Sequence, residues 1–111
     1  MTKVSEEILQ DIVRTIIAEV HPEKIILFGS QVNGNITDDS DMDLMIVERE
    51  PFGKHRSRWK ELRRIRRLLA KIRIPKDILV FSVDEFEERK HGMNDIIADS
   101  FQEGRVLYER F

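Results

Sequence analysis

The chain has 111 residues, of which 41% are hydrophobic and 36% charged, and its formal net charge is −2. This length predicts a single domain over residues 1–111, and the composition excludes an intrinsically disordered chain. The sequence has no cysteine, no signal-peptide pattern and no apolar run near the ~20 residues of a membrane span, so we expect a cytoplasmic protein without disulfides, thiolate metal sites or membrane contact.

The charges are distributed unevenly along the chain. Residues 1–50 carry 11 acidic and 4 basic side chains, and residues 77–111 carry 9 acidic and 4 basic ones. Residues 51–76 instead carry 11 basic side chains and a single acidic one, Glu61. This local asymmetry is more informative than the net charge, because it marks a basic segment between two acidic ones.

The first half of the chain predicts one helix and two strands. Residues 5–20 have apolar side chains at helical spacing after a serine that can cap the first turn. Residues 24–28 form a short apolar run that ends at a glycine, which is typical of a buried strand. Residues 29–40 are rich in Gly, Asn, Ser, Thr and Asp and predict a loop that includes one helical turn. Strand character returns over residues 41–47.

The second half predicts further elements of both kinds. Residues 54–72 have apolar side chains at helical spacing with basic residues on the other faces. A third apolar run over 77–83 predicts a strand, and short helices are expected over 84–90 and 94–103. Residues 106–108 can add an edge strand. Strands that alternate with helices predict an α/β (α+β) domain, with helices packed on a small mixed sheet of three to four strands.

The candidate metal ligands are three aspartates. Alternate residues of a strand point to the same face, so Asp41 and Asp43 are expected side by side at the start of a buried strand. Two like charges in such a place are costly unless a cation lies between them. Asp77 opens the next apolar run and reaches the same ion if the two strands are neighbours. Carboxylate oxygens without Cys or clustered His favour Mg²⁺ or Mn²⁺, the ions used for in-line attack on a phosphate.

A candidate phosphate-binding turn precedes these acids. Gly29 and Ser30 directly follow the first apolar strand, where glycine lets a phosphate approach the backbone and the serine hydroxyl can donate to it. The segment has neither the P-loop pattern nor Gly-x-Gly-x-x-Gly, which excludes those two kinds of nucleotide site.

The combined motif resembles the DNA polymerase beta-like nucleotidyltransferase superfamily, whose signature is an apolar residue, Gly-Ser, a spacer, and two acids one residue apart. Residues 28–34 (Phe-Gly-Ser-Gln-Val-Asn-Gly) and 40–44 (Ser-Asp-Met-Asp-Leu) are similar to the short stand-alone members called minimal nucleotidyltransferases (MNT). The resemblance continues to Asp77 and to residues 103–108 (Glu-Gly-Arg-Val-Leu-Tyr), so it covers nearly the whole chain.

This resemblance implies a polymerase beta-like fold and a chemistry. A nucleoside monophosphate would pass from ATP or another NTP to an acceptor hydroxyl, with loss of pyrophosphate. Asp41 and Asp43 would bind the metals, and Asp77 would complete the metal site and help to deprotonate the hydroxyl. Gly29 and Ser30 would hold the β- and γ-phosphates.

The resemblance also implies a partner protein. Small members typically work with a separate helical protein of the HEPN or substrate-binding type, often as the antitoxin of a toxin–antitoxin pair. The acceptor would then be a protein hydroxyl, such as a tyrosine of that partner.

One difference from the MNT pattern leaves a second hypothesis open. Many members carry Gly-Ser-Arg-x-Arg-Gly, whereas this chain has Gln31 and Asn33 at the two arginine positions. Amides donate hydrogen bonds to phosphate but carry no charge. The chain could therefore be a binding module that keeps the fold and neutralises or scaffolds a helical partner without catalysis.

The basic helix also allows more than one interpretation. Residues 54–73 carry ten bases and one acid. Long basic side chains commonly solvate an outer helix face, but this number exceeds what solubility needs and leaves contact with an NTP tail, RNA or an acidic partner equally open. We expect Trp59 in the core. The histidines lack ligand spacing and receive no role.

Overall fold

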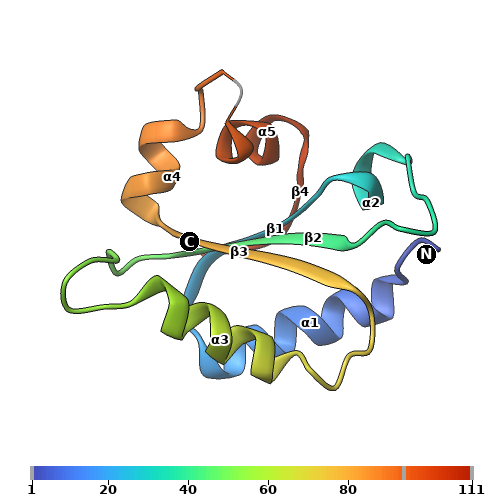
Figure 1. Cartoon of the computed structure of the whole chain (residues 1–111), viewed down its shortest axis with the longest axis horizontal. Coiled ribbons are helices and arrows are strands. Elements are labelled where there is room, and N and C mark those ends of the chain that lie inside the picture. The colour runs from blue at the N-terminus through green and yellow to red at the C-terminus, as the bar shows by residue number, and fades with distance from the viewer. Residues whose placement is uncertain (1, 94, 111) are drawn as a thin grey trace.

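A mixed sheet of four strands in the order β3-β2-β1-β4 forms the centre of the molecule (Figure 1). The computed structural model describes residues 2–93 and 95–110. The strands are β1 (Pro22–Phe28), β2 (Met42–Glu48), β3 (Lys76–Ser82) and β4 (Arg105–Glu109). The helices are α1 (Glu6–Glu19), α2 (Ser30–Asn33), α3 (Arg58–Leu68), α4 (Val83–Arg89) and α5 (Ile96–Glu103). The predicted mixed sheet with packed helices is therefore confirmed.

The strand directions bring three chain segments to one end of the sheet. β1 is antiparallel to β2 and β4, whereas β2 and β3 are parallel. Parallel neighbours need a crossover, and α3 supplies it between β2 and β3. The end of β1 and the beginnings of β2 and β3 consequently lie together.

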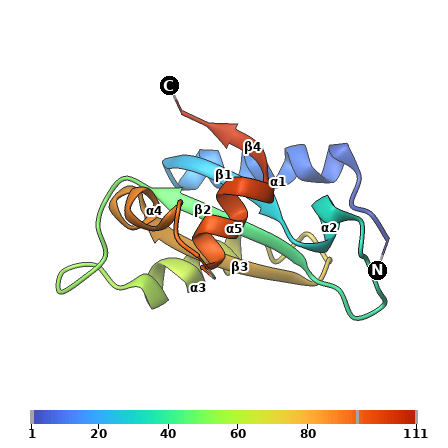
Figure 2. The same cartoon turned by 90° about the horizontal axis from the view of Figure 1, so that it is seen from above.

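Helices cover both faces of the sheet. α1 and α3 lie on one face, and α4 and α5 lie on the other (Figures 1 and 2). Side chains of β2 alternate between these layers: Leu44 and Ile46 belong to the core under α1 and α3, whereas Met45 and Val47 belong to the core under α4 and α5. Sequence parity along a strand thus tells which helical layer a side chain faces.

α1 forms as its sequence predicts. The Ser5 hydroxyl accepts a hydrogen bond from the Ile8 amide at 3.3 Å, which caps the first turn. Leu9, Ile12 and Ile16 are buried against the sheet at helical spacing. The expected helix over 5–20 is confirmed apart from its terminal residues.

The bounds of two elements differ from the prediction in ways that affect function. β2 begins at Met42, so Asp41 precedes the strand instead of opening it. α3 covers Arg58–Leu68, not 54–72, because the Ser57 hydroxyl caps it by accepting from the Lys60 amide at 3.3 Å. The expected core position of Trp59 is wrong, since its surface is 68% exposed.

The remaining predicted elements are present. The strand expected over 77–83 is β3, and the helix expected over 84–90 is α4. α5 matches the helix expected over 94–103, although residue 94 lies outside the described residues. The edge strand expected at 106–108 is β4. Within the described residues, every helix is too short or too polar to cross a bilayer.

Candidate functional site

Two predicted site residues are register partners at one end of the sheet. Asp43 in β2 pairs with Asp77 in β3, and on its other side it pairs with Phe28 at the end of β1. In-register residues of parallel strands lie about 4.8 Å apart and point to the same face. The condition that the two acid-bearing strands be neighbours is therefore met.

Strand alternation places these acids under the layer of α4 and α5. Asp43 lies two positions before Met45 in β2, and Asp77 lies two positions before Leu79 in β3. Met45 and Leu79 both pack in that layer, so each aspartate points to the same face of the sheet. Asp41 lies two positions before Asp43 and is exposed. The amide of Met42, between the two acids, donates to the Pro75 carbonyl at 2.9 Å. This hydrogen bond joins the first residue of β2 to the residue that precedes β3.

The electrostatics of Asp43 reflect this crowding. Burial raises the pKa of Asp43 above its ordinary value of 3.8, and the charges of Asp77 and Asp41 raise it further. Both effects disfavour the ionised carboxylate. A nearby cation would reverse that balance by favouring the charged form.

Gly29 touches the same carboxylate from the β1 side. Its φ of 72° lies in the region that favours glycine. A Cβ atom at this position would lie 2.1 Å from Oδ2 of Asp43. The turn after β1 therefore passes directly against the acid, and a side chain at residue 29 would occupy the space of that carboxylate.

Ser30 is the first residue of α2, and Gly29 takes the cap position before it. The Ser30 hydroxyl oxygen is buried and has no hydrogen-bond partner among the described residues. An unpaired buried polar group costs roughly 1–3 kcal/mol. A ligand oxygen that accepts from this hydroxyl would recover the cost.

The donor set fits a divalent metal that shares its ligands with substrate. Among residues 2–93 and 95–110, no group of three His, Asp or Glu side chains lies close enough to hold a metal ion, so the described structure does not bring Asp41, Asp43 and Asp77 together as three ligands of one ion. Mg²⁺ is usually held by one or two carboxylates together with substrate phosphates, not by protein ligands alone. The side-by-side carboxylates of Asp43 and Asp77, with Asp41 in electrostatic reach, suit that mode.

The family profile for polymerase beta nucleotidyltransferases ("Polymerase beta, Nucleotidyltransferase") matches residues 10–110, almost the whole chain. The chain belongs to this family. The resemblance that the sequence motifs indicated is thereby confirmed, and the protein is a nucleotidyltransferase by family. A comparison with curated proteins found no significant match.

Solved structures share the nucleotidyltransferase fold. A proposed nucleotidyltransferase from Sulfolobus solfataricus has a TM-score of 0.62 and 19% identity, over 94% of this chain and 79% of that one. A toxin–antitoxin complex with AMP-PNP has a TM-score of 0.60 and 15% identity, over 92% and 73%. The toxin–antitoxin pair MntA–HpeT, in a mutant with two Asp-to-Glu substitutions, has a TM-score of 0.59 and 13% identity, over 92% and 73%. At these identities the likeness establishes the fold alone.

In this nucleotidyltransferase the residue after Gly-Ser has a structural role. Gln31 is 6% exposed, its side-chain oxygen accepts from the Val4 amide at 2.8 Å, and its nitrogen donates to the Thr2 carbonyl at 3.2 Å. The sequence suggested a phosphate donor here, but these bonds direct the amide to the N-terminal segment. Asn33 is exposed, and its oxygen accepts from the Asn35 amide at 2.9 Å.

The basic helix α3 lies on the other side of the sheet from Asp43 and Asp77. α3 packs on the face opposite α4 and α5, whereas Asp43 and Asp77 share the face of those helices. Lys76, next to Asp77, donates its ammonium to the carbonyls of Ile72 and Ile74 instead. α3 therefore does not supply the positive charge that the missing arginines would have brought.

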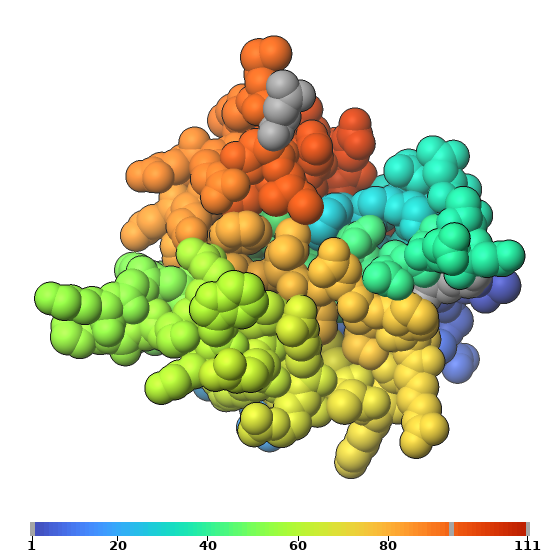
Figure 3. All heavy atoms as spheres, viewed as in Figure 1, coloured from blue at the N-terminus to red at the C-terminus, as the bar shows by residue number. Residues whose placement is uncertain are grey.

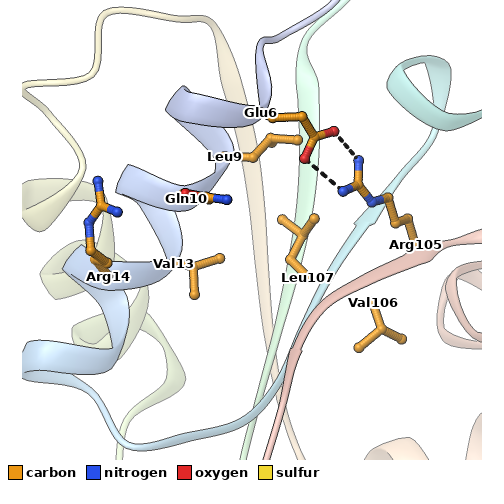
Figure 4. A pocket seen from close by; sticks show the side chains of 8 residues that line it. All are labelled: Glu6, Leu9, Gln10, Val13, Arg14, Arg105, Val106 and Leu107. Atoms are coloured by element: carbon orange, nitrogen blue, oxygen red, sulfur yellow. Dashed lines mark hydrogen bonds and ion pairs between the residues drawn. The ribbon is translucent and has the colours of Figure 1, made fainter.

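Three surface hollows of the nucleotidyltransferase are lined by other residues than the acids. One of about 360 Å³ separates α1 from β4, and the Glu6–Arg105 ion pair spans it with contacts of 2.6 and 2.8 Å (Figure 4). A second hollow, of about 390 Å³, lies between α1 and α3, and a third, of about 440 Å³, lies beside the start of α1. Asp41 and Asp77 are instead exposed at the end of the sheet.

Proposed function

We propose that this nucleotidyltransferase moves AMP from ATP, or the equivalent group of another NTP, to a hydroxyl on a partner protein. The observation that carries the proposal is the contact of the Gly29 backbone with Asp43, at the point where Asp43 and Asp77 lie side by side. The turn that we propose to bind phosphate adjoins a pair of carboxylates there, and this proximity is what attack on a phosphorus atom requires.

Each residue of the turn and the acid group has a defined task in this proposal. The acceptor oxygen forms a bond to the α-phosphorus, the bond from that phosphorus to pyrophosphate breaks, and the hydroxyl proton passes to Asp77. Gly29 lets the β- and γ-phosphates approach the backbone, and the buried Ser30 hydroxyl donates to one of their oxygens. Asp41, Asp43 and Asp77 would share a Mg²⁺ or Mn²⁺ ion with the bound phosphates, and that ion would supply positive charge that offsets them.

The fold relatives support a partner protein, which we take as the acceptor. Two of them are toxin–antitoxin proteins, and one of these complexes contains AMP-PNP. In the MntA–HpeT mutant the two Asp-to-Glu substitutions are separated by a single residue, the same spacing as Asp41 and Asp43. We place this chain in a similar antitoxin role in the cytoplasm, with a helical HEPN-type or substrate-binding protein as its partner.

The second candidate function is a binding module without catalysis. The observation that favours it is the uncharged turn after Ser30, where Gln31 is buried on the N-terminal segment and gives the triphosphate no cation. Such a module would bind and neutralise the same partner. Calorimetry with Mg·ATP separates the two functions, since a pure binding module gives no triphosphate-dependent heat.

The test is transfer of label from ATP carrying ³²P at the α-phosphate. The protein is incubated with Mg²⁺, the labelled ATP and the product of the adjacent gene, and the proteins are separated on a gel. We expect label on the partner with the native chain and with Asp39→Asn, which neutralises an exposed acid outside the group. Asp43→Asn should abolish it. The enzymatic proposal is wrong if label never transfers, or if Asp41→Ala with Asp43→Ala leaves transfer unchanged.

A further inference from the structure

The basic side chains of residues 54–73 fall into two groups. Arg56, Arg58 and Arg64 are used within the fold. Arg56 bonds Glu48 and Glu61 at 2.5 and 2.9 Å, and Arg58 bonds the Val80 carbonyl at 2.7 Å.

The other seven bases of this segment are exposed, and within the described residues they have no ion-pair or hydrogen-bond partner for their side chains. They are Lys54, Lys60, Arg63, Arg66, Arg67, Lys71 and Arg73. Stability of the fold therefore does not account for them.

Four of these bases gather with Trp59 on one strip of α3. At about 100° per residue, an arc of about 120° holds Trp59, Lys60, Arg63, Arg66 and Arg67. We name this strip the α3 outer face. The single acid of the helix, Glu61, is buried on the opposite side at 7% exposure. In Figure 3 the α3 segment, green to yellow, covers the lower part of the visible surface. The α3 outer face is thus a continuous cationic strip without an acidic side chain.

The helix dipole does not explain this composition. A positive charge is favourable in the last turn, where Arg66 and Arg67 lie, but unfavourable in the first turn, where Lys60 lies. Trp59 is also in the first turn and is 68% exposed. An indole in water beside a row of cations has no packing role in the described structure.

We propose that the α3 outer face binds single-stranded RNA. Guanidinium groups of Arg63, Arg66 and Arg67 contact phosphates in a geometry that favours bidentate hydrogen bonds. The exposed ring of Trp59 gives a base a surface to stack on, and a row of cations beside an aromatic ring is the common arrangement for single strands. A membrane surface is a poorer occupant, because the strip lacks the apolar stripe that inserts between lipids.

The sheet keeps this ligand away from the proposed transfer site. The α3 outer face and the acids Asp43 and Asp77 lie on opposite sides of the sheet. RNA binding therefore stands independently of nucleotidyl transfer, and we expect Asp43→Asn to leave it unchanged.

The sole tryptophan of the chain provides the readout. Fluorescence of Trp59 in the native chain is titrated with a 12-nucleotide oligo(U) RNA at several salt concentrations. Stacking of a base should quench the indole. Phosphate contacts from Lys60 and the three arginines of the α3 outer face predict a slope of log K against log salt of about −3.

Variants separate stacking from charge. Arg63→Gln with Arg66→Gln and Arg67→Gln should reduce the slope by about 2. Trp59→Ala, followed by anisotropy of a labelled RNA, should weaken binding about tenfold without changing the slope. The matched control is Lys3→Gln with Arg14→Gln and Arg49→Gln, which removes the same charge elsewhere and should leave affinity nearly unchanged.

Three results would overturn the proposal. One is the absence of saturable quenching at low salt. Another is equal weakening by the control triple variant, which would mean that net charge alone attracts the RNA. The third is equal quenching by poly-glutamate, which would assign the strip to an acidic protein partner.

Discussion

Gly29 and Asp43 adjoin so closely that a Cβ on the glycine would lie 2.1 Å from Oδ2 of the aspartate. The glycine also has a φ of 72°, which L side chains rarely adopt. Two independent causes therefore keep residue 29 without a side chain. The contact fixes the turn after β1 against the acid at the start of β2, and it links the phosphate-binding and carboxylate parts of the proposed site.

Gly29→Ala should destabilise the fold by about 1–3 kcal/mol, because alanine is strained at this φ, and should also displace the Asp43 carboxylate. We expect label transfer to fall at least tenfold. Urea denaturation and the labelling assay measure the two effects. Gly34→Ala is the control, since its φ is 84° but no atom lies within 4 Å of the added Cβ. It should lose stability without losing activity, and equal losses of activity in both variants would contradict the assigned role of the contact.

Asp77→Asn should stabilise the metal-free protein at neutral pH. The pKa of Asp43 is raised by burial and by the charges of Asp77 and Asp41. Because the pKa of Asp43 is raised, ionising it in the fold costs stability as the pH rises from 3.8 through that raised pKa, and the cost persists at higher pH. Removing one neighbouring charge lowers that cost. Thermal denaturation without metal measures it.

The same variant tests the metal proposal. Excess Mg²⁺ should raise the melting temperature of the native chain and of the Asp39→Asn control, but should raise that of Asp77→Asn much less. An equal rise in all three proteins would place the ion elsewhere.

Glu48→Gln should flatten the dependence of stability on pH. Burial, followed by the neighbouring Glu61, raises the pKa of Glu48 from 4.5 to about 7. The folded chain then holds this proton more tightly than the unfolded chain does, so stability should fall as the pH rises from 4.5 to about 7. Urea denaturation across this range measures the slope. Glu50→Gln is the control, because Glu50 contacts the same Arg56 at 3.4 Å but is exposed. A native slope in Glu48→Gln would contradict this assignment.

Gln31→Arg should not restore a phosphate-binding arginine. The side chain at this position is buried on Val4 and Thr2, so a guanidinium there loses those bonds and destabilises the fold by roughly 1–3 kcal/mol. Asn33→Arg is the matched variant at the second arginine position and lies on the exposed part of α2. We expect it to tighten ATP binding about tenfold. Calorimetry gives both affinities, and tighter binding by Gln31→Arg would show that its side chain reaches the triphosphate.

Local patterns were sufficient for most of the fold. The apolar spacing of α1 and the short runs of β1, β2 and β3 identified these elements, because each buries one face or both. Trp59 was misplaced because a three-residue step to Leu62 looks helical. On the helix, however, it lies about 60° outside the apolar stripe. The spacing of one pair of residues does not define a helix face. The angular positions of all residues around the helix axis do.

The site was only partly accessible from sequence. The neighbouring positions of Asp43 and Asp77 follow from two similar strand openings, and the register confirms that they are adjacent. The close approach of Gly29 to Asp43, which leaves no room for a Cβ atom, depends on backbone torsions that no residue pattern encodes. The hydrogen bond from Val4 to Gln31 joins segments 27 residues apart, so no local sequence pattern predicts it.

The most direct measurement of the central claim is the intact mass of the partner protein after incubation with this chain, ATP and Mg²⁺. We expect the partner to gain whole AMP units with the native chain and with Asp39→Asn, and none with Asp43→Asn. An unchanged mass with the native chain would contradict transfer. A gain equal to a phosphate group would contradict attack at the α-phosphorus, and with it the roles given to Gly29, Ser30 and the three aspartates.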